Sequence, residues 1–159
     1  MKQLVDLLRE NARLSEEQLA VMLGISAEEV AKRLKKLEED GTIIGYSAII
    51  NEEEFDKNCV SAFIELKVSP QAKCGYDEIA REIARYPEVE SVYLMSGSFD
   101  LSVTLRGSSL REVALFVSDR LAPIDGVLST TTHFILRRYK EKGSLFANCL
   151  TDERSLVSP

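Results

Sequence analysis

The sequence predicts an α+β chain in which a three-helix head precedes a four-stranded sheet with two helices on one face. Three observations predict this fold. Within residues 14–45 the same helix-start signal occurs twice, eleven residues apart. After residue 58 the hydrophobic period changes from that of a helix to that of a strand. The elements that follow read βαββαβ, which is the order of the ferredoxin-like, or split βαβ, fold.

The head contains two predicted helices with capping boxes. Ser15 with Gln18, and Ser26 with Glu29, each provide a hydroxyl that can accept from a free amide and a side chain that can reach back. Gly24 lies between the two helices and can adopt the positive φ that ends a helix in a tight turn. Together with a helix expected over residues 4–12, this pattern predicts a helix-turn-helix unit.

The second capped helix carries the candidate DNA-binding surface. Val30, Leu34 and Leu37 recur at helical spacing and form its apolar face. The opposite side carries small residues and cations, which suit insertion into a major groove. It also carries the carboxylate of Glu28, which indicates either a contact with cytosine or a weakened or altered operator. The candidate DNA-binding residues are Ser26, Ala27, Glu28, Ala31, Lys32, Arg33, Lys35 and Lys36.

The charge of the chain limits this interpretation. The net charge is −6, which argues against a general binder of polyanions or membrane surfaces. Residues 1–50 contain seven Lys/Arg and nine Asp/Glu, so the basic patch is only local. Modest affinity per subunit would require the avidity of a dimer. The alternative is an ordinary three-helix domain, which also needs capped helices and a glycine turn.

The domain boundaries follow from composition. Residues 42–50 (TIIGYSAII) predict short β structure, either a wing or a connecting strand. The polar stretch NEEEFDKN that follows marks a boundary. The expected segments are a helix-turn-helix domain over 1–45, a linker strand and hinge over 46–58, a ferredoxin-like domain over 59–140, and an edge strand and tail over 141–159.

The sheet domain shows clear strand alternation. Strands are expected over 59–68, 89–95, 99–106 and 127–137, helices over 76–83 and 110–121, and a further edge strand over 145–150. Ser109 and Glu112 form a third capping box. The uncovered face of the sheet would present an apolar surface that should not remain in water, so we expect a second subunit to cover it. Its apolar members are Phe63, Tyr93, Met95 and Ile135.

The remaining patterns predict no metal and no cofactor. Cys59, Cys74 and Cys149 are odd in number and widely spaced, as expected of free thiols in a reducing compartment. No apolar run approaches 18 residues and no signal-peptide pattern is present, so we expect a cytoplasmic protein.

Several of these motifs together resemble the Lrp/AsnC family of leucine-responsive and "feast/famine" transcription factors. In the head the resemblance rests on ENARLS at 10–15 and LGIS at 23–26. In the sheet it rests on MSGSFDL at 95–101, DGV at 125–127 and TTT at 130–132. It covers about residues 4–140 and includes motifs of both domains in the same order.

The resemblance implies a homodimer, or a tetramer or octamer built from dimers, that binds double-stranded promoter DNA. It also implies a RAM-type sheet domain that binds a small effector, usually an amino acid, between subunits at the G-x-x-D hairpin. Carried over to this sequence, that effector site is Met95, Gly97, Ser98, Phe99 and Asp100. The chemistry agrees, because backbone amides beside a glycine can bind a carboxylate and an aspartate can bind an ammonium group.

Three residues of the last strand, Ser129, Thr131 and His133, are added to the candidate effector site on the assumption that this strand neighbours the hairpin. The alternative for the hairpin is that Gly97 only forms a turn and that Asp100 is a solvated strand residue.

Two rival functions remain open. Siroheme decarboxylases resemble this architecture, but their chemistry needs protonatable groups at a tetrapyrrole, and the single histidine, His133, lies in an ordinary strand pattern. The other rival is an amino-acid-binding assembly protein whose head does not bind DNA. The sequence favours a DNA-binding regulator over an enzyme.

Overall fold

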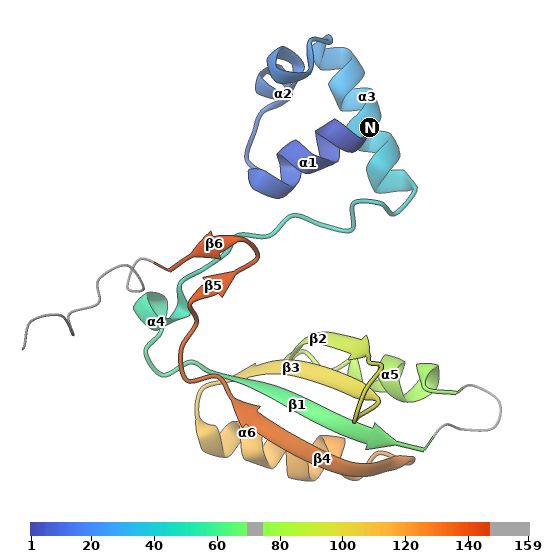
Figure 1. Ribbon diagram of the computed structural model, residues 1–159, viewed down its shortest axis with the longest axis vertical. Coiled ribbons are helices and arrows are strands. Elements are labelled where there is room, and N and C mark those ends of the chain that lie inside the picture. Colours follow the sequence, from blue (N-terminus) through green and yellow to red (C-terminus); the bar gives the residue numbers. More distant parts are fainter. Residues whose placement is uncertain (70–74, 147–159) are drawn as a thin grey trace, which may run out of the picture. The chain divides into compact units, whose positions relative to one another are not determined.

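The computed structural model describes residues 1–69 and 75–146 and divides into two compact units, Met1–Ile49 and the chain from Ile50 onward (Figure 1). Cys74 and Cys149 lie outside the described residues, as does most of the predicted strand over 145–150 and of the tail. No helix in the described ranges is long and apolar enough to cross a membrane.

The first unit is the predicted three-helix head. Its helices are α1 (Lys2–Glu10), α2 (Glu16–Leu23) and α3 (Ala27–Glu39). Each helix contributes apolar side chains to one small core, because hydrophobic residues recur on one side of each. The buried members of this core are Leu4, Leu19, Ala20, Val30 and Leu37.

The turn between α2 and α3 forms as predicted. Ser15 Oγ accepts from the Gln18 amide at 3.2 Å, and the Gln18 side chain accepts from the Ser15 amide at 2.9 Å, which completes the capping box. Gly24 ends α2 in the left-handed region with φ of 66°. The amide of Ile25 then donates to the carbonyl of Ala20 at 3.1 Å, as in a Schellman motif.

The other two capping boxes form only in part. Ser26 Oγ accepts from the Glu29 amide at 3.2 Å, but the Glu29 carboxylate pairs with Arg33 instead of returning to Ser26. Ser109 Oγ likewise accepts from the Glu112 amide. The Glu112 carboxylate, however, binds the residue before the cap. In the first case a charged partner four residues ahead competes successfully with a neutral amide.

The predicted β structure over residues 42–50 is wrong. None of these residues is in a strand, and the side chain of Ile44 is 98% exposed. A strand needs a neighbour for its backbone hydrogen bonds, and no described strand pairs with this segment. The polar stretch that follows contains a short helix that the sequence did not predict, α4 (Glu52–Phe55).

The second unit contains a four-stranded antiparallel sheet with the order β2-β3-β1-β4 (Figure 1). The predicted βαββαβ order is therefore confirmed. The last strand is shorter than expected, ending at residue 134 instead of 137. The elements are β1 (Val60–Val68), α5 (Asp77–Ile83), β2 (Val89–Leu94), β3 (Leu101–Gly107), α6 (Leu110–Phe116) with its π-helical extension η1 (Val117–Leu121), and β4 (Val127–Phe134).

Both helices pack on the same face of the sheet. Alternate residues of the central strand β1 are buried against Ile79 and Ile83 of α5 and against Val113 of α6. These strand residues are Ala62, Ile64, Leu66 and Val68. Because side chains alternate along a strand, the residues between them point to the opposite face, which is called the outer face below.

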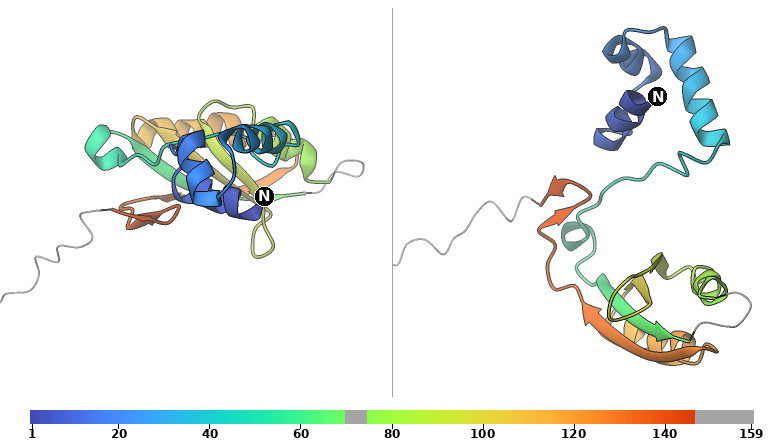
Figure 2. Two further views of the ribbon diagram at one scale, coloured as in Figure 1. Left: turned by 90° about the horizontal axis from the view of Figure 1, so that it is seen from above. Right: turned by 45° about the vertical axis from the view of Figure 1, so that its right-hand side comes forward.

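The described C-terminal residues do not extend this sheet. β5 (Lys140–Glu141) pairs with β6 (Ser144–Leu145) in a separate two-stranded hairpin (Figures 1 and 2). The edge strand predicted from residue 145 is therefore not found in its described part.

Candidate DNA-binding and effector sites

The exposed side of α3 holds most of the predicted DNA-binding residues. Glu28, Lys32, Lys35 and Lys36 are all exposed and lie opposite the buried Val30. Ala27 and Ala31 are partly exposed, and their short side chains leave a shallow surface between the longer ones. A helix with this profile can approach the floor of a major groove closely.

Ion pairs within α3 decide which cations remain available. Arg33 donates through Nε to Glu29 at 2.7 Å, and Lys35 lies 3.7 Å from Glu39. Of the predicted cluster, only Lys32 and Lys36 form no ion pair with any residue that the structure describes. Arg33 thus stabilises the helix through Glu29, whereas Lys32 and Lys36 can contact phosphates or bases.

The end of α3 is held by hydrogen bonds to the residues that follow. The Thr42 amide donates to Asp40 at 3.0 Å. Hydrogen bonding from the Thr42 side chain, and then from this amide, lowers the pKa of the Asp40 carboxyl, with a smaller contribution from Lys36. The Tyr46 hydroxyl donates to Glu38 at 2.9 Å, and burial together with this carboxylate raises the pKa of Tyr46. The carboxylates of Glu38 and Asp40 at this end of α3 therefore already accept hydrogen bonds within the head.

The predicted effector hairpin is an open loop between β2 and β3. The Met95 amide donates to the carbonyl of Asp100 at 2.8 Å and closes the loop. The amides of the four residues between them donate no hydrogen bond to any described residue, and the first three of these residues are exposed. The loop therefore presents several free N–H groups, which is the arrangement that binds an anion such as a carboxylate.

Gly97 is not required by the loop of its own subunit. Its φ lies outside the left-handed region, and a Cβ atom at this position would meet no atom within 4 Å. Neither backbone strain nor crowding within the subunit explains a glycine here. A close approach from outside the subunit would explain it, since a side chain would block access to the amides.

Asp100 has a structural role that the sequence did not reveal. Its carboxylate accepts from the Val68 amide at 2.9 Å, and its own amide donates to the Leu66 carbonyl at 2.9 Å. One residue thus joins the hairpin to the end of β1. Only Oδ2 takes part in the side-chain bond, so Oδ1 remains available for a ligand.

An aromatic row on the outer face connects the hairpin to the last strand. Phe63 contacts Phe99 edge-to-face and also contacts His133, with both pairs of ring centroids 6.1 Å apart. His133 Nε2 in turn lies 3.3 Å from a carboxylate oxygen of Glu65. The sequence placed Phe63 on this face but did not indicate that it links two predicted parts of the site.

The three added residues of β4 lie on the same outer face but not beside the hairpin. In the β1–β4 pairing, the partners on β1 are Lys67 for Ser129, Glu65 for Thr131 and Phe63 for His133. They do not come from a strand next to β3, as the sequence analysis assumed, because β1 lies between β3 and β4. At about 4.8 Å per strand spacing, they are roughly 10 Å from the line of β3.

No group of three or more His, Cys, Asp and Glu side chains in the described ranges is arranged to hold a metal ion. Burial raises the pKa of the Cys59 thiol, which disfavours the thiolate form needed for nucleophilic attack or metal binding.

Comparison with known proteins identifies the family. Residues 61–145 match the model of the Lrp/AsnC ligand binding domain, and residues 2–44 match that of a winged helix-turn-helix DNA-binding domain. The chain belongs to the Lrp/AsnC family. It is a transcriptional regulator with a DNA-binding head and a ligand-binding sheet domain, as the sequence motifs predicted.

Relatives support this assignment over most of the chain. It is 48% identical to the uncharacterized HTH-type transcriptional regulator YugG of Bacillus subtilis, covering 99% of this chain and 95% of YugG. It is 30% identical to the regulator FL11 of Pyrococcus furiosus, covering 91% and 92% of the two chains. The structure of the regulator NMB0573 of Neisseria meningitidis, solved with L-methionine, matches with a TM-score of 0.71 at 28% identity, covering 93% and 95%.

The engagement of Asp100 with Val68 leads to a testable difference between two substitutions. Asp100→Ala leaves a buried amide without its acceptor, and we expect a loss of about 1–3 kcal/mol in unfolding free energy. Asp100→Asn retains an oxygen acceptor, so its loss should be clearly smaller. Urea unfolding followed by circular dichroism measures both. Equal losses for the two variants would contradict the proposed role of this hydrogen bond.

Proposed function

We propose that the regulator binds duplex promoter DNA as a homodimer and places the exposed side of α3 in the major groove. The observation that carries this proposal is the surface of α3, where Lys32 and Lys36 are exposed and unpaired among the described residues. Ser26 caps the helix as an acceptor, which leaves its hydroxyl hydrogen free to bind a phosphate. The proposed contacts are Ser26, Ala27, Glu28, Ala31, Lys32, Lys35 and Lys36, with Arg33 orienting the helix through Glu29.

The second subunit in this proposal covers the outer face of the sheet. Tyr93 is 61% exposed there, and Met95 and Ile135 are also exposed. Phe63 lies on β1, one of the two inner strands of the sheet, and contacts Phe99. An apolar surface without a cover is unfavourable in water, and a second copy is the simplest cover in a family of symmetric assemblies. Dimers of this kind can associate further into tetramers or octamers.

The effector in this proposal is an amino acid bound at the hairpin over residues 95–100. Its carboxylate would accept from the free amides beside Gly97, and its ammonium group would bind Asp100 through Oδ1. Met95, Ser98 and Phe99 would complete the site. The structure of NMB0573 with L-methionine supports an amino acid as the chemical class. Effector binding at a subunit boundary would change how dimers pack and so alter the spacing of the two reading helices.

We assign the β4 residues Ser129, Thr131 and His133 to the same covered face, where they would contribute to the subunit boundary. A role as a regulator in the cytoplasm, without enzymatic activity of its own, completes the proposal. The single histidine and its carboxylate neighbour lie on the proposed interface instead of in a pocket, which favours a structural role for them.

The DNA-binding proposal predicts a salt-dependent affinity. Binding of a promoter fragment, measured by fluorescence anisotropy, should give a linear plot of log affinity against log salt, because phosphate contacts release counterions. Lys32→Ala should weaken binding and reduce the slope by about one for each subunit. Lys57→Ala, which removes an exposed lysine outside the head, should behave as wild type. A slope near zero, or equal effects of the two substitutions, would refute the proposal.

The effector proposal predicts a ligand response that depends on Gly97. At least one of the twenty standard amino acids should raise the melting temperature, because a ligand of the native state stabilises it. Gly97→Ala should reduce that rise without changing the melting temperature of the free protein, since the added methyl group meets open space. Gly45→Ala is the matched control, because this glycine also has open space and an ordinary φ. A rise that is unchanged in Gly97→Ala for every amino acid would contradict an effector site at the hairpin.

A further inference from the structure

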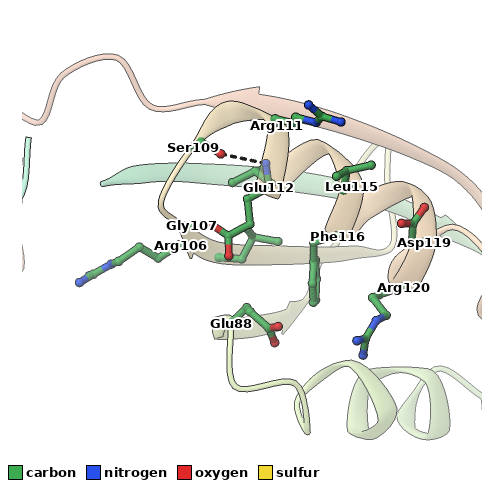
Figure 3. Close-up of a pocket in the computed structure, with 12 residues that line it drawn as sticks. Glu88, Arg106, Gly107, Ser109, Arg111, Glu112, Leu115, Phe116, Asp119 and Arg120 are labelled. Atoms are coloured by element: carbon green, nitrogen blue, oxygen red, sulfur yellow. Dashed lines mark hydrogen bonds between the residues drawn. The ribbon is translucent and has the colours of Figure 1, made fainter. Parts of the chain in front are cut away.

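A cavity of about 380 Å³ lies on the helix-covered side of the sheet, away from the hairpin and the outer face. It is bounded by α6 and η1 on one side and by the segment that joins α5 to β2 on the other (Figure 3). Its size falls in the lower part of the usual range of small-molecule sites, about 300–1,000 Å³. The side chains that line it include Glu88, Leu105, Phe116 and Arg120.

Glu88 brings an unsatisfied carboxylate oxygen to this cavity. Its Oε2 atom is shielded from solvent, and no described residue donates a hydrogen bond to it. A shielded carboxylate oxygen without a donor is unfavourable, so native structures seldom retain one. A bound group with N–H donors, such as an ammonium, would satisfy it.

Arg120 provides the opposite charge on the same cavity. Its guanidinium lies 5.8 Å from the centre of the Tyr86 ring, and Tyr86 packs edge-to-face on Phe116 with ring centroids 5.4 Å apart. Phe116 is only 8% exposed, so the aromatic wall is fixed by the core. Arg120 forms no ion pair with a described residue, and Figure 3 shows Glu88 and Arg120 on two sides of the Phe116 ring.

The other charged groups around the cavity are occupied or point elsewhere. Arg106 pairs with Glu52 and Glu90. Glu112 accepts from the amide and the hydroxyl of Ser108. Arg111 points away from Glu88 and Phe116 (Figure 3). Asp119 accepts a hydrogen bond from the hydroxyl of Ser118 at 2.7 Å. Glu88 and Arg120 are therefore the two opposite charges that remain for an occupant.

We propose that this cavity is a second small-molecule site of the regulator, suited to a small zwitterion such as a free amino acid. The ammonium group binds Glu88, the carboxylate binds Arg120, and the apolar part of the ligand lies against Phe116. The site is contained within one subunit, so it does not depend on the proposed interface or on the hairpin site. This cavity gives the sheet domain a second ligand-binding site, on the opposite face of the same sheet.

The test is an NMR titration of the full chain with each of the twenty standard L-amino acids, observing the ring resonances of Phe116 and Tyr86. At least one amino acid should shift these resonances in a saturable manner. Glu88→Gln and Arg120→Gln should each weaken that binding at least about tenfold, because each removes a charge-assisted hydrogen bond. Glu82→Gln, which changes an exposed carboxylate of α5, should bind as wild type, and so should Gly97→Ala.

The free protein provides a second measurement. Glu88→Gln removes an unsatisfied shielded charge, so the variant should unfold at the same temperature as wild type or higher, whereas a merely structural carboxylate would destabilise the protein when lost. The proposal is overturned if no amino acid shifts the Phe116 and Tyr86 resonances, or if Glu88→Gln binds as wild type. Weaker self-association of Glu88→Gln without any ligand effect would also overturn it, by assigning this carboxylate to a neighbouring subunit.

Discussion

The number of helices available to cover the sheet is the constraint on which the rest of this structure depends. Two helices can bury one face of a four-stranded sheet, and here both pack on the side of Ile64 and Val103. Strand alternation then sends the intervening side chains to the outer face, where Phe63 forms its aromatic row. The proposed dimer, and with it the pairing of two DNA-reading heads, follows from the need to cover that face.

The hairpin site depends on the same sheet through Asp100. This residue binds the amide of Val68 and the carbonyl of Leu66, so the open loop is attached to the central strand instead of to its own hairpin alone. Phe99 of the loop also rests on Phe63. A ligand that changes the loop would therefore act on the strand and on the ring at the centre of the proposed interface. This connection is the physical route by which effector binding could alter assembly.

Much of the fold could be predicted because its signals are local. The box at Ser15 and the turn at Gly24 are decided by residues within a few positions of one another, and strand alternation is visible directly. The sequence predictions failed where the structure depends on a residue distant in the sequence or on a side chain that competes for the same hydrogen bond. Residues 42–50 have strand composition but no described strand to pair with, and Glu29 prefers Arg33 to its own cap. The link from Asp100 to Val68 spans 32 positions and leaves no mark in the sequence. The cavity at Glu88 combines residues of β3, α6, η1 and the segment before β2, and no one of these segments predicts it by itself.

The most direct test of the account is the oligomeric state of the full chain by sedimentation velocity over a range of concentrations. Wild type should sediment as a dimer or a larger assembly of dimers. Phe63→Glu, which places a charge at the centre of the outer face, should sediment as a monomer that keeps its circular dichroism spectrum. Leu110→Glu, at an exposed apolar residue on the helix side, should assemble as wild type. A monomeric wild type, or an assembly that Phe63→Glu leaves intact, would contradict the account.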